Sequence, residues 1–231
     1  MVRKLKTNAS DSLIESGVWM TPLRKQNGDL VWIRFTDSPS SHVLVVCQPG
    51  CLKHTEDLVN GVSFCAGVDR IDLELTDSPS SIRKTIRNYA ESLRNTQADL
   101  NKTVLVIHRV SDMFARVRRS DTEDRLLEDL DLILVEGPAR GVHVIMVQDA
   151  SDKGLRLLGK LDFDPDVVFG VGSLTPVACE MVFGHVVSSV CVRGRSKNIC
   201  WGTIRPADVE TNGEHLMSGL FDLRRSMVLR G

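Results

Sequence analysis

Reactive side chains in this 231-residue chain follow directly on runs of apolar residues. The first such segment, 47–54, reads CQPGCLKH and comes after the apolar run 42–46. A phosphate-binding loop, G-x-x-x-x-G-K-[ST], uses its glycines to bring backbone N–H groups onto the phosphates. Its lysine neutralises them, and its hydroxyl holds Mg²⁺. Of these four defining residues only the lysine remains here, since the equivalent positions are Cys47, Leu52, Lys53 and His54.

The replacements in this loop oppose phosphate binding. Leu52 places a branched side chain where the backbone must approach the β-phosphate, and Pro49 removes an N–H donor. His54 offers an imidazole, which is a poor ligand for Mg²⁺, an ion that prefers oxygen. Thr55 carries a hydroxyl, but it stands one position too late. We therefore interpret 47–54 as a degenerate nucleotide loop.

Two further apolar runs also end in polar residues. Segment 103–114 reads TVLVIHRVSDMF, and its run 104–107 predicts a strand that is buried on both faces of a parallel sheet. A nucleotide hydrolase carries acidic residues at the end of such a strand, to hold Mg²⁺ and orient water. His108 and Arg109 stand there instead, and Asp112 lies one helical turn further on. Gln148 and Asp149 follow the third run, 142–147.

The elements that must position these residues alternate between strand and helix. Apolar patterns predict strands at 30–35, 42–46, 71–75, 104–107, 142–147 and 166–171. Capping residues and helical periodicity predict helices from Ser78-Pro79, from Asp121 to Gly137, over 175–184 and over 214–225. We expect an arm or linker at 1–28 and one domain at 29–231, with a closing hairpin formed by 190–193 and 198–203. The alternation predicts an α/β fold with a mostly parallel central sheet flanked by helices.

Composition excludes several classes of protein. A net charge of −1 provides no global attraction to nucleic acid or to an anionic membrane. No stretch approaches the roughly 20 apolar residues of a membrane span. The basic start of the chain is not followed by the apolar segment of a secretory signal. We therefore interpret the six cysteines as free thiols in a reducing compartment.

The order and spacing of these segments resemble the FtsK/SpoIIIE branch of RecA-like P-loop ATPases, and most closely the ATPase modules of the EccC/EssC motors of type VII secretion. The likeness covers roughly 30–206. It rests on VLVVCQPGCLKHTEDLV, VLVIHRVSDMFARV and LLEDLDLILVEGPARGVHVIMVQDA. In the last of these, a helix leads into Gly-hydrophobic-His-hydrophobic-Ile, which is typical of this branch. The resemblance implies a RecA-like fold.

Measured against this family, the catalytic positions have changed together. Gly50 matches a glycine often found inside the family's loop, and Asp112 matches its downstream acid. The family's Asp-Glu pair, known as Walker B, is replaced by His108-Arg109, and its Thr-Gln sensor by Gln148-Asp149. Pro138 stands in place of the arginine before Gly-x-His. Because phosphoryl transfer depends on positioning and on charge stabilisation, we expect no hydrolysis, no catalytic or metal-binding residue, and no cofactor.

The resemblance therefore implies a non-catalytic (pseudo-ATPase) module, expected to be C-terminal, of a type VII secretion motor. Such a module would serve substrate or effector recognition, or regulation of neighbouring ATPase domains. The implied partners are secreted helical-hairpin substrates or effectors and other ATPase modules of the same motor. Neither nucleic acid nor direct membrane insertion is expected. The implied location is the cytoplasmic face, in the soluble part of a larger membrane-anchored protein.

Several alternatives stay open at this point. A divergent ATPase would bind ATP and Mg²⁺ through Lys53 and a metal held by Asp112 or Asp149. A DNA-translocase accessory is a further possibility, by analogy with the FtsK branch. Smaller hypotheses concern local groups. They are a zinc site of Cys47, Cys51, His54 and Cys65, a thiol nucleophile at Cys51 with His54 and an acid, a phosphate on Lys53, and an anion site at His108-Arg109. We interpret His143, within an apolar strand, as a core histidine.

Overall fold

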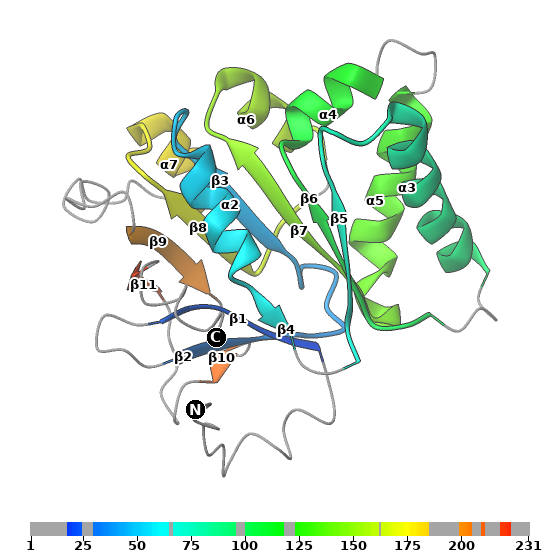
Figure 1. Ribbon diagram of the computed structural model, residues 1–231, viewed down its shortest axis with the longest axis horizontal. Helices are drawn as coiled ribbons and strands as arrows, with labels where there is room; N and C mark the ends of the chain where they lie inside the picture. Colours follow the sequence, from blue (N-terminus) through cyan, green and yellow to red (C-terminus); the bar gives the residue numbers. More distant parts are fainter. Residues whose placement is uncertain are drawn as a thin grey trace.

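The computed structural model (Figure 1) describes residues 18–24, 30–64, 67–95, 100–117, 123–161, 163–184, 199–204, 209–210 and 218–222. These residues form two sheets, with helices packed on the larger one. Predicted strands appear within two residues of their expected positions, so that the predicted α/β class is confirmed.

The larger sheet has the strand order β11-β9-β8-β3-β7-β6-β5. Its strands are β3 (Val43–Cys47), β5 (Asp69–Leu73), β6 (Thr103–Ile107), β7 (Val142–Asp149), β8 (Val167–Val171), β9 (Ile199–Ile204) and β11 (Ser218–Asp222). The five strands from β8 to β5 are parallel, and β9 and β11 add antiparallel pairs at one end. Because β7 lies between β3 and β6, the carboxyl ends of these three strands meet at one edge of the sheet. Ligands of open α/β folds bind at this edge.

The smaller sheet is antiparallel and has the order β10-β2-β1-β4. It consists of β1 (Val18–Arg24), β2 (Leu30–Phe35), β4 (Ser63–Phe64) and β10 (Val209–Glu210). Val18, Met20, Ile33 and Phe35 are buried against one face of the larger sheet. The structure therefore differs from the expected arm at 1–28, because part of that segment, Val18–Arg24, is a strand that buries apolar side chains.

Helices cover the two faces of the larger sheet unequally. α2 (Leu52–Asn60) and the smaller sheet pack on the face that includes Val43 and Val45. The opposite face, which includes Leu44 and Val46, is covered by further helices. These are α3 (Pro79–Arg94), α4 (Val110–Val117), α5 (Glu123–Glu136) and α6 (Asp152–Leu158). No helix in the described ranges is long and apolar enough to cross a bilayer.

Local capping sets the helix ends that the sequence predicts. The Ser78 side chain accepts a hydrogen bond from Ser81 N at the start of α3, and Pro79 occupies the first turn. The short 3₁₀ helix η1 (Pro138–Arg140) follows α5. Helix α7 (Pro176–Phe183) begins at its cap Thr175 and ends at Gly184, which adopts φ +71°. Both predicted helices are confirmed.

The expected tail helix at 214–225 is wrong over Ser218–Asp222. This segment is β11, whose backbone pairs antiparallel with β9 from Ser218–Thr203 to Asp222–Ile199. Pairing with a strand distant in sequence overrides a local helical preference here. The remainder of 214–225, and segment 190–193 of the expected hairpin, lie outside the described residues.

Two buried histidines join β3 and β7 to their surroundings. The His42 Nδ1 accepts from Val144 N at 3.0 Å, so Nε2 carries the proton and donates to Leu134 O at 2.7 Å. The His143 Nδ1 donates to Ser41 O at 2.9 Å. Burial lowers the pKa of each imidazole to about 4, against a partly opposing effect of its backbone hydrogen bond. The interpretation of His143 as a core histidine is confirmed.

Acid should therefore destabilise this fold. Both imidazoles take up a proton near pH 6.5 in the unfolded chain but only near pH 4 in the folded chain. The two neutral imidazoles should thus leave the free energy of unfolding undiminished above pH 6.5. This free energy should decrease as the pH falls from 6.5 towards 4. Each ring contributes up to about 1.4 kcal/mol per pH unit. Urea denaturation across this interval measures the slope. His143→Asn, which keeps a donor toward Ser41, should remove about half of it, and a flat wild-type profile would contradict the assignment.

Helix α6 approaches β7 most closely at Gly154. A Cβ there would overlap Gln148 Nε2 and lie 2.6 Å from Asp149 O. Gly154→Ala should lower the free energy of unfolding by about 1–3 kcal/mol, because the backbone of α6 must shift to make room. Gly159→Ala, at the end of the same helix, is the matched control. Its Cβ would meet nothing closer than 3.7 Å, so the change should stay within about 0.5 kcal/mol. Equal urea midpoints for the two variants would refute this packing argument.

Candidate functional site

The nucleotide-loop segment is a tight turn that is bonded to the turn after β8. Gln48 N donates to Val171 O, and Cys51 N donates to Gln48 O, each at 2.9 Å. The Gln48 side chain accepts from Ser173 N at 2.9 Å. Pro49 has no N–H to offer. The loop therefore directs these N–H groups at protein carbonyls, whereas a phosphate loop directs its own at the ligand.

Two residues of the loop have structural roles. Cys47 ends β3 with its thiol fully buried, and burial raises the pKa of that thiol. Gly50 adopts φ +91°, a left-handed conformation that the turn requires and that a side chain would oppose. Cys51 Sγ lies so close to Gly172 that a Cβ there would stand 2.7 Å from the sulfur. The thiols thus pack into the interior.

The first turn of α2 carries the remaining loop residues. Leu52 packs against the core beneath the helix, and Lys53 is exposed. His54 is half-buried, and its Nδ1 has no hydrogen-bond partner among the described residues. Thr55 is fully buried and donates its hydroxyl proton to Cys51 O at 3.1 Å. The nearest hydroxyl to the Mg²⁺ position of a phosphate loop is therefore turned into the protein.

His108, at the end of β6, faces the outer strand β5. Its Nε2 lies 3.0 Å from Asp72 Oδ1. The same carboxylate receives two hydrogen bonds from Arg70, at 2.7 and 2.8 Å, and Arg70 also donates to Val59 O. Burial alone would raise the pKa of Asp72, but the bonds from Arg70 and His108 outweigh it and hold this pKa below its usual value. His108 is thus hydrogen-bonded to the carboxylate of the Arg70–Asp72 ion pair.

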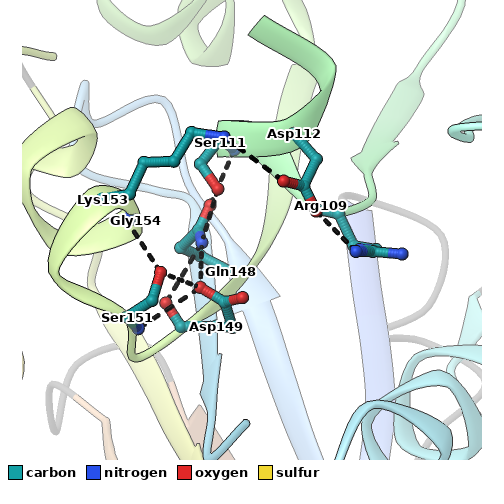
Figure 2. Close-up of polar contacts among 8 residues, drawn as sticks. All are labelled: Arg109, Ser111, Asp112, Gln148, Asp149, Ser151, Lys153 and Gly154. Carbon is teal, nitrogen blue, oxygen red and sulfur yellow. Dashed lines mark hydrogen bonds and ion pairs between the residues drawn. The ribbon is translucent and has the colours of Figure 1, made fainter. Parts of the chain in front are cut away.

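Arg109 and Asp112 form a second ion pair at the start of α4 (Figure 2). Arg109 Nη2 lies 2.6 Å from Asp112 Oδ2, and Lys153 Nζ reaches the other oxygen at 3.4 Å from α6. Arg109 adopts φ +52°, which costs a non-glycine residue about 1 kcal/mol or more. Two cations therefore neutralise the acid that matches the family's downstream aspartate.

Gln148 lies at the centre of a third cluster, and it is only 1% exposed (Figure 2). Its amide accepts from Ser111 N at 2.8 Å and donates to Ser111 Oγ at 3.1 Å. The amide also donates to Asp149 Oδ1 at 2.8 Å, and Ser151 Oγ donates to the same oxygen at 2.6 Å. Ser151 in turn caps α6 by accepting from Gly154 N. The sensor positions thus join β7, α4 and α6.

These three clusters occupy the edge where a Mg²⁺-nucleotide would need a free hydroxyl and free carboxylates. Thr55 is turned inward, Asp112 is bound by two cations, and Asp149 is bonded to Gln148 and Ser151. The arrangement does not fit Mg²⁺-nucleotide chemistry. In the described part of the chain, no group of three His, Cys, Asp or Glu side chains is placed to hold a metal. Cys65, the fourth member of the imagined zinc site, lies outside that part.

Sequence reasoning found the residues that end β3, β6 and β7 but missed their partners. Ser151 could have been predicted as a helix cap, because it is a serine directly before the polar first turn of α6. Asp72, Ser111 and Lys153 gave no such signal. Each contacts a residue at least 36 positions away in sequence, and only the fold brings the two together.

Comparison with known proteins identifies the fold. No protein-family model matches the chain, and no curated protein matches it in sequence. Among solved structures, the conjugation coupling protein TcpA of pCW3, in its monomer form with ATPγS, has a TM-score of 0.61 and 12% identity. That match covers 96% of this chain and 73% of TcpA.

Two structures of the type VII secretion ATPase EccC from Thermomonospora curvata also match. The cytoplasmic domain has a TM-score of 0.52 and 12% identity, over 85% of this chain and 26% of EccC. ATPases 2 and 3, in complex with a signal sequence peptide, have a TM-score of 0.50 and 14% identity, over 85% of this chain and 40% of theirs. The chain thus spans less than half of either EccC structure. It has the fold of the ATPase domains in these secretion and conjugation proteins, and at the level of the fold the resemblance predicted from its sequence is confirmed.

Proposed function

We propose that this chain is a non-catalytic module of a type VII secretion motor, which recognises secreted substrates or effectors or regulates neighbouring ATPase modules. In this proposal the fold keeps the ATPase scaffold, and the nucleotide site has become structural. The degenerate nucleotide loop is Cys47, Gly50, Leu52, Lys53 and His54. The degenerate Walker B and sensor residues are His108, Arg109, Asp112, Gln148 and Asp149.

The main support for the proposal is that the polar groups at the carboxyl edge of the sheet form hydrogen bonds and ion pairs with one another. Asp112 is paired with Arg109 and Lys153, and Gln148 is bonded to Ser111 and Asp149. Rebuilding a Mg²⁺ site here would require breaking these bonds. Leaving the buried Gln148 and Ser111 side chains unpaired would cost about 1–3 kcal/mol for each group. ATP hydrolysis would also need a general base in the place of Arg109, whose guanidinium stays protonated.

The motor context is supported by the similarity to EccC. The match covers 85% of this chain and 26% of the EccC cytoplasmic domain, as expected for one module among several. One of the matching EccC structures contains a signal sequence peptide, which supports a role in recognising secreted proteins. By the same analogy, we place the module on the cytoplasmic face of a larger membrane-anchored motor, next to other ATPase modules.

Mg-ATP should not stabilise this protein. A ligand present at 100 times its Kd adds about 2.7 kcal/mol to the free energy of unfolding, which moves the Tm of a domain of this size by several degrees. We expect no such shift at millimolar Mg-ATP, and phosphate release at the level of buffer alone. Thermal melting and a steady-state phosphate assay measure the two quantities.

Lys53→Ala is the matched control for both assays. Its side chain is exposed, so that the variant should fold and melt like the wild type. If the wild type releases phosphate and Lys53→Ala does not, the chain is a divergent ATPase and the proposal is wrong.

Recognition of secreted proteins is tested separately. Titration of the chain with purified helical-hairpin substrates and effectors of its cognate secretion system should show binding that is unchanged by Mg-ATP, because no nucleotide-dependent state is available. Isothermal calorimetry gives the affinity. Absence of binding to all of them would remove the recognition role and leave only regulation of neighbouring modules.

A further inference from the structure

Helix α7 presents apolar side chains to solvent along its outer face. The helix reads PVACEMVF, with Glu180 as its one charged residue. Val177 is 65% exposed and Met181 57% exposed, and the two are spaced one turn apart on the same face. A helix that is apolar all round is normally buried on every side. The outer face of α7 is therefore a candidate for contact with another molecule.

The inner face of α7 packs against the core. Ala178 and Cys179 are buried. Phe183 packs edge-on against Trp201 of β9, with ring centroids 4.4 Å apart. These contacts fix the orientation of the helix, so that Val177 and Met181 face outward as a consequence of packing. Figure 1 shows α7 near β8, at the opposite side of the larger sheet from α3 and α5.

A cavity of about 710 Å³ adjoins this outer face. Its floor includes Leu44 and Val168 of the sheet, one side is formed by α6 and the segment after it, and the other by the end of α7 from Met181 to Gly184. Most lining side chains are apolar, among them Leu155, Leu158, Leu161, Phe163, Val182 and Phe183. Met181 belongs both to the cavity and to the exposed face, so the two form one continuous apolar surface.

The exposed charge on the outer face of α7 is acidic: Glu180 lies between Val177 and Met181. Asp164 is exposed where it lines the cavity, whereas Asp166, which also lines it, is buried. Among the described residues that line the cavity, there is no lysine or arginine. A partner with apolar anchors would therefore gain from a basic residue near them and lose from an acidic one.

We propose that α7 and the adjoining cavity bind an amphipathic helix of a partner protein, with apolar side chains at helical spacing and lysine or arginine beside them. The inference rests on the recognition role proposed above and names its surface. A helix fits better than a small molecule, because Val177 and Met181 extend the apolar surface along α7, outside the cavity. Helices that dock in grooves place side chains at i, i+3, i+4 and i+7 in this manner.

The test uses synthetic peptides of about 18 residues, five helical turns, made of leucine and lysine in amphipathic order. A second peptide replaces lysine with glutamate, and a third has the first composition in scrambled order. Fluorescence anisotropy with the full chain should give a Kd for the leucine–lysine peptide at least tenfold lower than for the other two. Equal affinity for the lysine and glutamate peptides, or for the scrambled peptide, would overturn the proposal.

Variants locate the surface. Met181→Lys and Val177→Lys should each weaken binding of the leucine–lysine peptide about tenfold or more, and Glu180→Lys should invert the preference between the lysine and glutamate peptides. Val135→Lys is the matched control, because Val135 is 43% exposed but lies on α5. It should bind as the wild type does. Since all four residues are exposed, each variant should keep its Tm.

Further outcomes separate this inference from the proposed function. If Met181→Lys and Val177→Lys bind like the wild type, α7 is not the surface, even where Mg-ATP leaves the Tm unchanged and the proposed function stands. If the wild type sediments as a dimer that Met181→Lys makes monomeric, a second copy occupies the surface, and the proposed partner is wrong. Peptide binding through α7 together with ATP hydrolysis would refute the pseudo-ATPase assignment alone.

Discussion

The hydrogen bonds of one buried amide, that of Gln148, hold together the part of this molecule where a nucleotide would act. The side chain is almost fully buried, so its donor and acceptor must find protein partners or cost about 1–3 kcal/mol each. It finds them in Ser111 and Asp149, which begin α4 and end β7. Asp149 then binds Ser151, the cap of α6. Two helices are thereby positioned by a residue in the strand between them, and the edge of the sheet is closed by polar bonds.

Charged groups at this edge are also paired with other groups of the protein. In a nucleotide site, carboxylates at the strand ends are neutralised by Mg²⁺, and without the metal they would repel one another. Here the protein supplies the cations itself, with Arg109 and Lys153 on Asp112 and Arg70 on Asp72. Arg109 adopts a strained, positive φ, and in this conformation its guanidinium pairs with Asp112. In the pseudo-ATPase that we propose, the loss of metal ligands and the gain of cations are a single change.

The sequence predicted the parallel strands and capped helices because their signals are local: an unbroken β-branched run such as 104–107, or a serine–proline start such as Ser78-Pro79. It failed at Val18–Arg24, which pairs with β2 and β4, and at Ser218–Asp222, which pairs with β9. At the site, the motif positions were readable as changed residues. Their partners were not, because a hydrogen bond such as the one between His108 and Asp72 depends on the fold and leaves no pattern in the sequence.

The closed loop and the exposed face of α7 are physically connected. Ser173, which donates its N–H to the Gln48 side chain, lies three residues before the first residue of α7, and Gly172 packs against Cys51. In a working motor, a loop that binds and releases nucleotide would move whatever is bonded to it. In this chain the loop is bonded to β8 and to the turn that leads into α7, so the start of that helix has a fixed position. A surface that must recognise a partner gains from such rigidity, because less conformational entropy is lost on binding. In the pseudo-ATPase that we propose, a structural nucleotide loop and an exposed apolar helix are therefore compatible within one scaffold.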